Sequence, residues 1–192
     1  VLLSPKERPG NKFTNIFAFY LQRLSFRMMI NRSTTIFALN EKLYDEVLRL
    51  GFPKEKLEML GAGIDYKRIN EHPVSNKHGY DAVALGRTTP VKGIFDAVKI
   101  WEKVHAELPE AKMAWIGGGD DSIRERILAQ LRSSGLEDSF SLLGYIDKDD
   151  VYDILHTSKV FLCPDHENGW GLAVCEAMAS GLPVVSYDLD IF

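Results

Sequence analysis

Two cationic side chains flank a turn bounded by glycines near the middle of the chain. Arg87 and Lys92 lie in the segment Gly86-Arg-Thr-Thr-Pro-Val-Lys-Gly93, between a short apolar run and a stretch with helical spacing. Cations that converge where a turn opens into a helix can bind a phosphate group. An ordinary surface turn with exposed cations is the alternative, and this segment alone does not separate the two.

A second group of candidates lies in the last third of the chain. The tight turn Asn168-Gly-Trp-Gly171 leads directly into a predicted helix at 172–179. The backbone N–H groups of such a turn, together with a helix N-terminus, can bind an anion. Glu176 lies among apolar neighbours in this helix, where a carboxylate is costly without a partner, so it is a candidate acceptor for ligand hydroxyls. A polar residue on the exposed face of an amphipathic helix is the alternative.

A glycine triplet, Gly117-Gly-Gly119, follows another apolar run. A dinucleotide-binding fingerprint needs a further glycine at position 122, which is Ser122, and an acidic residue after the next strand, which is also missing. The triplet therefore disfavours an oxidoreductase and favours a place where backbone and ligand approach closely.

The elements that position these residues are regular from residue 81 onward. Five apolar runs predict buried strands, at 82–85, 113–116, 140–143, 160–163 and 183–186. Helical spacing between them predicts helices at 94–104, 123–131, 149–156 and 172–179. This alternation predicts an α/β fold with a Rossmann-like parallel sheet sandwiched by helices. The candidates follow the strands, at the edge where such sheets bind ligands.

The first 80 residues are less regular. They contain an aromatic-rich helix candidate at 13–30, a strand at 34–39, a helix at 41–51, a strand at 57–60, and a linker or hairpin at 72–80. The helix at 13–30 is expected to pack against this domain or a neighbouring one. Contact with a membrane surface is the alternative, because Arg23, Arg27 and Arg32 accompany its apolar residues.

The composition excludes several classes of protein. The 192 residues are 45% hydrophobic, with 27 acidic and 23 basic side chains and a net charge of −4, which disfavours disorder and nucleic-acid binding. We find no apolar run long enough to span a membrane and no signal-peptide pattern. Cys163 and Cys175 lack the spacing of a disulfide framework or a metal site, so a cytoplasmic setting is expected.

The ordered set of motifs resembles the donor-binding domain of retaining glycosyltransferases of the group 1, family 4 type, which have the GT-B fold. The resemblance covers residues 34–188 and rests on Gly86-Arg-x4-Lys-Gly93, Ile116-Gly-Gly-Gly119, Leu143-Gly-Tyr145 and Gly169-Trp-Gly-Leu-x3-Glu-Ala-Met-Ala-x-Gly-Leu-Pro-Val-Val185. It implies binding of a nucleotide-diphospho-sugar, UDP- or GDP-linked, and retaining transfer of the sugar to a glycan or lipid-linked acceptor in polysaccharide biosynthesis. No metal or other cofactor is implied, although Asp147-x-Asp149 and Asp188-x-Asp190 resemble a metal motif of the other glycosyltransferase fold.

The resemblance also implies roles for single residues. Arg87 and Lys92 would neutralise the diphosphate and Glu176 would accept hydrogen bonds from the ribose hydroxyls; these three form the expected catalytic set. The residues expected to bind the rest of the donor are Gly86, Gly118, Tyr145, Ile146, Glu167, Asn168, Gly169, Trp170, Gly171 and Leu172. The family usually has a glutamate at the position of Asn168, so either Asn168 or, with a one-residue insertion, Glu167 would contact the sugar. His166 beside them is a surface residue or a further sugar contact.

The resemblance finally implies that the chain is a fragment. Residues 1–33 would be the remnant of a preceding acceptor domain or a linker helix, and residues 34–192 a nucleotide-sugar-binding domain truncated at its C-terminus. Without its acceptor domain the chain is expected to transfer nothing alone. The parent protein could contact the inner face of the membrane, and self-association through residues 13–30 is plausible. A non-catalytic binding or assembly module of the same fold is the alternative function, and the turn at 169–171 disfavours an epimerase or a phosphorylase.

Overall fold

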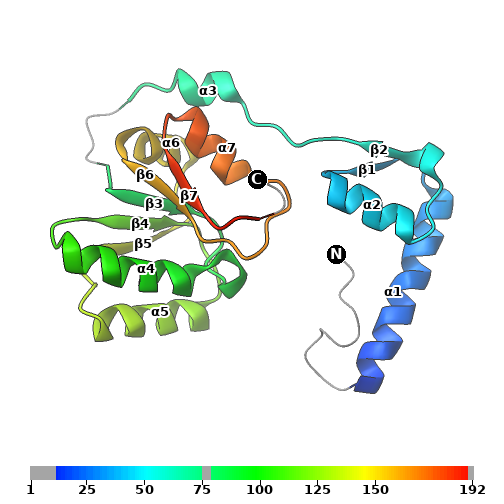
Figure 1. The fold of residues 1–192 in the computed structure, drawn as a ribbon, viewed down its shortest axis with the longest axis horizontal. Coiled ribbons are helices and arrows are strands. Elements are labelled where there is room, and N and C mark those ends of the chain that lie inside the picture. Colours follow the sequence, from blue (N-terminus) through cyan, green and yellow to red (C-terminus); the bar gives the residue numbers. More distant parts are fainter. Residues whose placement is uncertain (1–11, 75–78, 190–192) are drawn as a thin grey trace. The chain divides into compact units, whose positions relative to one another are not determined.

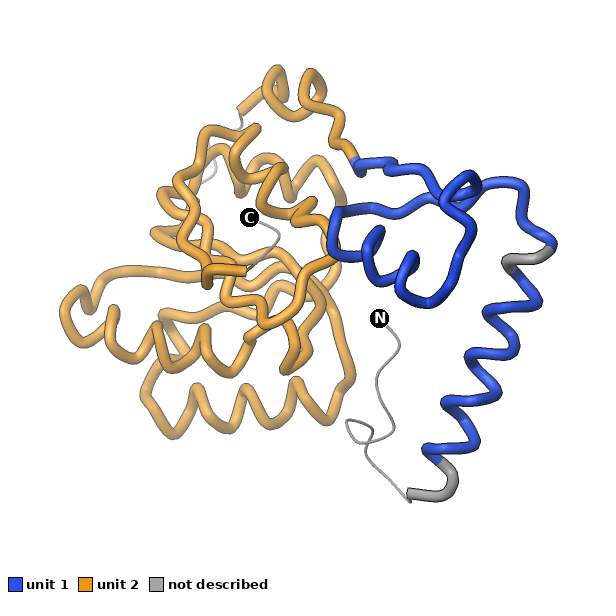
Figure 2. The backbone as a smooth tube through the Cα atoms, turned by 45° about the vertical axis from the view of Figure 1, so that its right-hand side comes forward, with its two compact units in different colours: residues 1–62 blue, residues 63–192 orange. Residues whose placement is uncertain are grey.

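The computed structural model describes residues 12–74 and 79–189, and the chain divides into two compact units at residues 62 and 63 (Figure 2). The sequence predicted a boundary after residue 33. The structure instead groups the first helix with the segment that follows it, because the ring of Phe26 contacts that of Phe52 at 5.8 Å and Lys56 Nζ donates to the Ser33 carbonyl at 3.0 Å. These two contacts join residues that are far apart in the sequence, which a local pattern does not reveal.

Unit 2, residues 63–192, is built on a parallel sheet of five strands (Figure 1). The strands stand in the order β5-β4-β3-β6-β7, and every neighbouring pair is parallel. Their bounds are β3 (Ala82–Leu85), β4 (Met113–Ile116), β5 (Phe140–Gly144), β6 (Val160–Cys163) and β7 (Val184–Ser186). All five predicted strands are confirmed.

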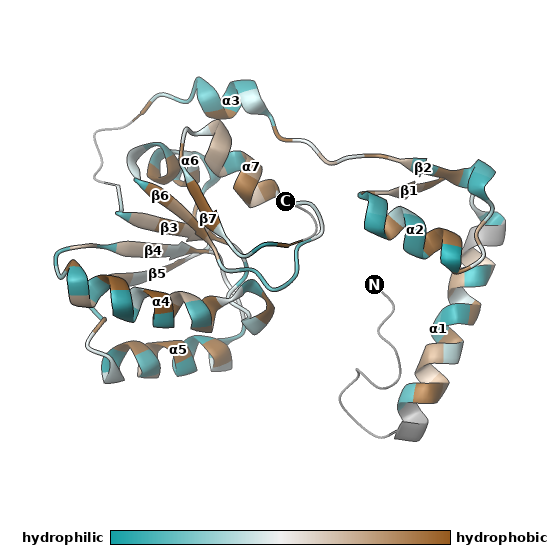
Figure 3. Ribbon diagram, in the orientation of Figure 1, coloured by the Kyte–Doolittle hydropathy of each residue, from teal (hydrophilic) through white to brown (hydrophobic). Residues whose placement is uncertain are grey.

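Helices cover both faces of this sheet, so the predicted Rossmann-like α/β fold is confirmed. The helices α4 (Ile94–Glu107) and α5 (Asp121–Ser133) cover one face, while α3 (Tyr66–Asn70), α6 (Lys148–Thr157) and α7 (Leu172–Ala179) cover the other. Side chains alternate between the faces: Ala82 and Ala84 enter the first core and Val83 enters the second. Figure 3 shows polar and apolar residues alternating along α4 and α5, as expected for helices with one face on a sheet.

The sequence did not predict α3, because five residues are too few to show a helical period. Its start does carry a signal, since the Asp65 side chain accepts from Arg68 N at 3.0 Å and caps the helix. Of the predicted linker at 72–80, residues 75–78 lie outside the described part of the chain, and the others form no helix or strand.

Unit 1, residues 1–62, contains α1 (Lys12–Arg32), β1 (Ile36–Ala38), α2 (Glu41–Arg49), a short 3₁₀ turn (Lys54–Lys56) and β2 (Leu57–Met59). The strands β1 and β2 are parallel, and Ala38, Val47 and Leu57 form a small core with α2. Several large apolar side chains of α1 are exposed, among them Phe17, Tyr20, Leu24 and Met28. Over the described residues, no helix combines the length and the apolar character that crossing a membrane requires.

Candidate functional site

The strand order creates a switch point in unit 2, between β3 and β6. From β3 the chain builds outward through β4 and β5 on one side, and then through β6 and β7 on the other. The loops that leave the carboxyl ends of β3 and β6 therefore diverge, and open parallel sheets bind their ligands in the crevice between such loops. Residues 86–93 form the first loop and residues 164–171 the second, so both groups of sequence candidates meet at this point.

Lys92 joins the two loops. Its Nζ donates to Asp165 Oδ2 at 2.6 Å and lies 3.4 Å from the Glu167 carbonyl oxygen. The side chains of Lys92 and Asp165 are only 22% and 10% exposed, so this pair is mostly removed from solvent. Gly93 allows the close approach, because it has φ +70° and a Cβ there would lie 1.8 Å from the Pro164 carbonyl oxygen.

The turn before α7 is held from within by Asn168. Its Oδ1 accepts from Gly171 N at 2.8 Å and from Trp170 N at 3.3 Å, while its Nδ2 donates to Asp165 Oδ2 at 2.8 Å. The sequence predicted that the amides of this turn are free to bind an anion. The structure places the side chain of Asn168 on two of them, so the amides of Trp170 and Gly171 are already engaged within the loop.

The neighbours of Asn168 lie on the outer side of the loop. Glu167 is exposed, and Gly169 and Leu172 are exposed as well. His166 makes a third link to the first loop, because its N–H donates to the Val91 carbonyl at 2.9 Å and its Nε2 lies 2.5 Å from Asp96 Oδ2. This contact gives His166 a structural partner in α4.

Glu176 faces a cation from a neighbouring helix. Lys148 Nζ lies 3.6 Å from Glu176 Oε1, and the Glu176 side chain is 17% exposed. A hydrogen bond with the Tyr152 hydroxyl, and to a smaller extent the Glu176 charge, raise the pKa of Lys148. The ammonium group also lies over the Tyr152 ring, 5.6 Å from its centroid. The predicted need of Glu176 for a partner is therefore met by Lys148 in this structure.

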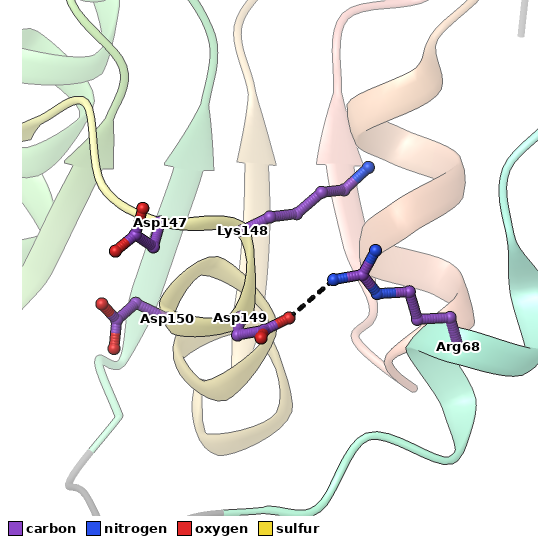
Figure 4. A pocket seen from close by; sticks show the side chains of 5 residues that line it. All are labelled: Arg68, Asp147, Lys148, Asp149 and Asp150. Carbon is purple, nitrogen blue, oxygen red and sulfur yellow. Dashed lines mark hydrogen bonds and ion pairs between the residues drawn. The ribbon is translucent and has the colours of Figure 1, made fainter.

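An open pocket of about 360 Å³ surrounds the start of α6 (Figure 4). Arg68 reaches it from α3 and pairs with Asp149 at 2.9 Å. The other lining residues are Asp147, Lys148 and Asp150. In the part of the chain that the structure describes, no group of three His, Cys, Asp or Glu side chains is arranged to hold a metal ion. Asp190, from the second Asp-x-Asp motif, lies outside that part.

The glycine triplet lines a smaller cavity of about 200 Å³ between the loops after β3, β4 and β5. A Cβ at Gly118 would lie 2.2 Å from the Tyr145 ring, and one at Gly117 would lie 2.2 Å from the Gly86 carbonyl oxygen. The triplet thus permits a close approach to the neighbouring loops, and the close approach to a ligand stays a prediction. Tyr145 is 83% exposed and offers its ring to this cavity, while Ile146 packs against the core below it.

The structure brings some of the site residues predicted from the sequence together and leaves others apart. Lys92 lies with Glu167 and the turn at 168–171, and Gly86 adjoins the Lys92 side chain. Gly118 lies with Tyr145, and Glu176 with Lys148. Arg87 is exposed, and no hydrogen bond or ion pair joins its side chain to the rest of the described chain.

Sequence reasoning missed Asp165 and Lys148, which partner the two main candidates. Asp165 lies two residues after the buried strand β6, and this position is a signal that points to the edge of the sheet where ligands bind. The buried thiol of Cys163 lies one residue before this loop begins, and burial, followed by the Asp165 charge, raises its pKa. A thiol with a raised pKa stays protonated, which argues against a nucleophilic cysteine.

The comparison with known families agrees with this geometry. A family model described as "Glycosyl transferases group 1" matches residues 65–192, two thirds of the chain. The chain belongs to this family of group 1 glycosyltransferases. The resemblance noted from the sequence motifs is thereby confirmed at the level of the family.

Curated relatives of this group 1 glycosyltransferase chain include two bacterial proteins. The poly(glycerol-phosphate) alpha-glucosyltransferase of Bacillus subtilis is 34% identical over 111 residues, which are 58% of this chain and 16% of the relative. The mannosylfructose-phosphate synthase of Agrobacterium fabrum is 25% identical over 185 residues, 86% of this chain and 40% of the relative. The chain thus spans less than half the length of these relatives.

Solved structures show the same fold at lower identity. HepE from Anabaena, in complex with UDP and glucose, superposes with a TM-score of 0.74 at 17% identity, covering 97% of this chain and 50% of that one. TarM from Staphylococcus aureus, in complex with UDP among other ligands, gives a TM-score of 0.69 at 22% identity, covering 86% and 33%. These likenesses support the α/β fold of GT-B glycosyltransferases.

Proposed function

We propose that unit 2 binds a nucleotide-diphospho-sugar at the carboxyl edge of its sheet, as the donor half of a retaining glycosyltransferase. The observation that carries the proposal is the bond of Lys92, in the loop after β3, to Asp165, in the loop that leads from β6 to the N-terminus of α7. A cation and the free amides of a helix together suit a diphosphate. The likeness to HepE and TarM, whose structures contain UDP, supports the same ligand class.

The proposed chemistry depends on the leaving group. When the sugar leaves, negative charge grows on the diphosphate, and Lys92 with the first amides of α7 stabilises it without solvent reorganisation. Arg87 is exposed on the same loop and provides a second cation for the outer phosphate. These groups supply the charge that a metal ion would otherwise supply, so we propose that neither a metal nor another cofactor takes part.

The remaining parts of the donor fit the other candidates. The ribose diol would bind Glu176 and displace or share the ammonium group of Lys148, whose side chain is 59% exposed. The base would occupy the loop of Gly144, Tyr145 and Ile146, where the exposed Tyr145 ring offers a stacking surface. The sugar would reach the loop residues Glu167 and Asn168.

The acceptor side of the proposal lies outside unit 2. We propose that an acceptor-binding part of a longer protein completes the enzyme, that the 192 residues alone transfer nothing, and that the acceptor is a glycan or a lipid-linked glycan of polysaccharide biosynthesis. A cytoplasmic site is proposed with it. The exposed apolar side chains of α1 are candidates for contact with a membrane surface or with a second copy.

One observation favours a non-catalytic module instead. Asn168 is neutral, and its side chain is bonded to Asp165 and to two amides of its own loop. A loop in which Asn168 is bonded in this way suits a protein that binds a ligand or a partner without transferring a sugar. Activity of a longer protein that contains this chain, with Lys92 and Glu176 intact, separates the two functions.

A thermal-shift screen tests the ligand class. UDP-, GDP- and ADP-sugars are added to the chain, with Lys92→Met as the binding-deficient variant and the exposed Lys99→Met as its control. A ligand at a hundred times its dissociation constant adds about 2.7 kcal/mol of stability, which corresponds to a shift of about 5–10 °C in a domain of this size. We expect such a shift for one base in wild type and in Lys99→Met only. No shift with any of the three would contradict the proposal.

A further inference from the structure

Asp165 is a buried carboxylate at the centre of the site that sequence reasoning did not select. It is the second residue after β6, and its side chain is 10% exposed. A single oxygen, Oδ2, accepts from Lys92 Nζ at 2.6 Å and from Asn168 Nδ2 at 2.8 Å. Asp165 therefore joins residues from both loops that diverge at the switch point.

The two bonds to Asp165 have different physical effects. The bond from Lys92 is charge-assisted and short, so it fixes the end of a side chain that otherwise rotates about four flexible bonds. The bond from Asn168 fixes the amide group whose other end holds Trp170 N and Gly171 N. Moving Asp165 would disturb the cation and the turn before α7 at the same time.

The Asp165 carboxylate accepts hydrogen bonds from these two partners. Because it is negatively charged, it is not itself expected to bind an anion. A phosphate near it would be repelled, whereas the Lys92 side chain carries the opposite charge and is 22% exposed, against 10% for Asp165. Since a lysine ammonium group has three donors, Lys92 can keep its bond to Asp165 and still donate to a phosphate.

We propose that Asp165 is a positioning residue that sets Lys92 and the turn at 168–171 as one unit, and that this unit selects a nucleoside diphosphate over a monophosphate. The inference rests on the proposed function. It concerns how the proposed site recognises the second phosphate of the nucleotide. In the proposed complex, one phosphate of a diphosphate binds the first amides of α7 and the other binds the Lys92 ammonium group. A monophosphate engages only one of them, so the distance that Asp165 fixes determines the preference.

Calorimetry with UDP and UMP tests this coupling, or with GDP and GMP if the screen above selects guanine. The variant Asp165→Asn keeps the shape of the side chain and removes its charge, while Asp138→Asn changes an exposed aspartate at the opposite edge of the sheet. We expect the ratio of diphosphate to monophosphate affinity to fall about tenfold in Asp165→Asn and in Lys92→Met. The double variant should lose no more than either single one, and Asp138→Asn should keep the wild-type ratio.

A second variant covers the case in which Asp165→Asn does not fold. Asn168→Ala leaves the bond between Lys92 and Asp165 intact and cuts the link to the turn, so the ratio should fall there too. A wild-type ratio in Asn168→Ala or Asp165→Asn, or losses that multiply in the double variant, would overturn the coupling. If wild type binds neither nucleotide, the proposed function fails and the inference fails with it. If the variants still bind nucleotide and keep the wild-type ratio of diphosphate to monophosphate affinity, only the inference fails.

Discussion

The two edges of the sheet in unit 2 use charged residues in different ways. At the amino edge, Asp81 precedes β3, accepts from Lys112 N at 2.8 Å and pairs with Lys159 Nζ at 2.7 Å. Lys112 Nζ in turn donates to the Asp138 carbonyl at 2.8 Å. The side chains of Asp81 and Lys159 are 34% and 76% exposed, so these bonds tie the starts of neighbouring strands together in contact with water.

At the carboxyl edge the corresponding pair is buried. Lys92 and Asp165 lie 2.6 Å apart with little exposure, and Asn168 is bonded to the same carboxylate. Removing two charges from water is costly, and the cost is repaid only by close geometry and further hydrogen bonds. The amino edge thus pairs its charges in contact with water, while the carboxyl edge holds buried polar groups at the place where we propose that the ligand binds.

The largest expected effect comes from separating the two loops of the carboxyl edge. Gly93→Ala introduces a Cβ that would lie 1.8 Å from the Pro164 carbonyl oxygen, at a residue with φ +70°. We expect unit 2 to lose about 3 kcal/mol or more in the free energy of unfolding, measured by urea denaturation.

Gly135→Ala is the matched control for this loss. Gly135 has φ +66°, and no neighbouring atom lies within 4 Å of the place that its new methyl group would take. Only the conformational cost of about 1–2 kcal/mol therefore applies. Equal losses in the two variants would show that the close approach of the loops at Gly93 does not matter.

The next effect concerns Glu176. Glu176→Ala should weaken binding of the nucleoside diphosphate by about 1–3 kcal/mol, because two hydrogen bonds to a charged group are lost. Calorimetry measures the change, with Glu110→Ala, an exposed residue before β4, as the control.

The ligand offers a second control for Glu176. A 2′-deoxy nucleotide lacks one of the two hydroxyls, so it should bind wild type more weakly and lose less on Glu176→Ala. If Glu176→Ala weakened the binding of the ribose ligand and of the deoxyribose ligand equally, Glu176 would not act at the ribose.

The smallest effect belongs to the amino edge. The hydrogen bond with Lys159, followed by the bond from the Lys112 N–H, lowers the pKa of Asp81. A carboxyl group with a lowered pKa stabilises the fold above its unfolded pKa of about 3.9, and this contribution is lost as the pH falls through the folded pKa. Because the pair is exposed, we expect Asp81→Asn to cost about 0.5 kcal/mol at pH 7 and nothing below about pH 2–3.

Urea denaturation between about pH 2 and pH 7 measures the free energy of unfolding of wild type and Asp81→Asn, and calorimetry measures their affinity for the nucleoside diphosphate. Asp81→Asn should bind the nucleoside diphosphate as wild type does. A cost that grows at acid pH, or a loss of nucleotide affinity, would contradict the separation of the two edges.

The sequence was sufficient for the sheet and its covering helices, because apolar runs and helical spacing are local signals. It was not sufficient for α3, which is five residues long, or for the boundary between the units, which depends on the contact of Phe26 with Phe52. For the site, the sequence was enough to locate both loops but not to predict the hydrogen bonds that join them. Lys92 and Asp165 are 73 residues apart, and only the order of the strands brings them together.

The most direct test of the account measures the affinity of the chain for a nucleoside diphosphate, UDP or GDP, by calorimetry. Wild type and Lys99→Met should bind with the same affinity, and Lys92→Met should bind about tenfold to a hundredfold more weakly, because it loses a charged hydrogen bond to the phosphates. Binding by Lys92→Met that is as tight as that of wild type, or no binding of either nucleotide by wild type, would contradict a diphosphate site at the switch point of the sheet.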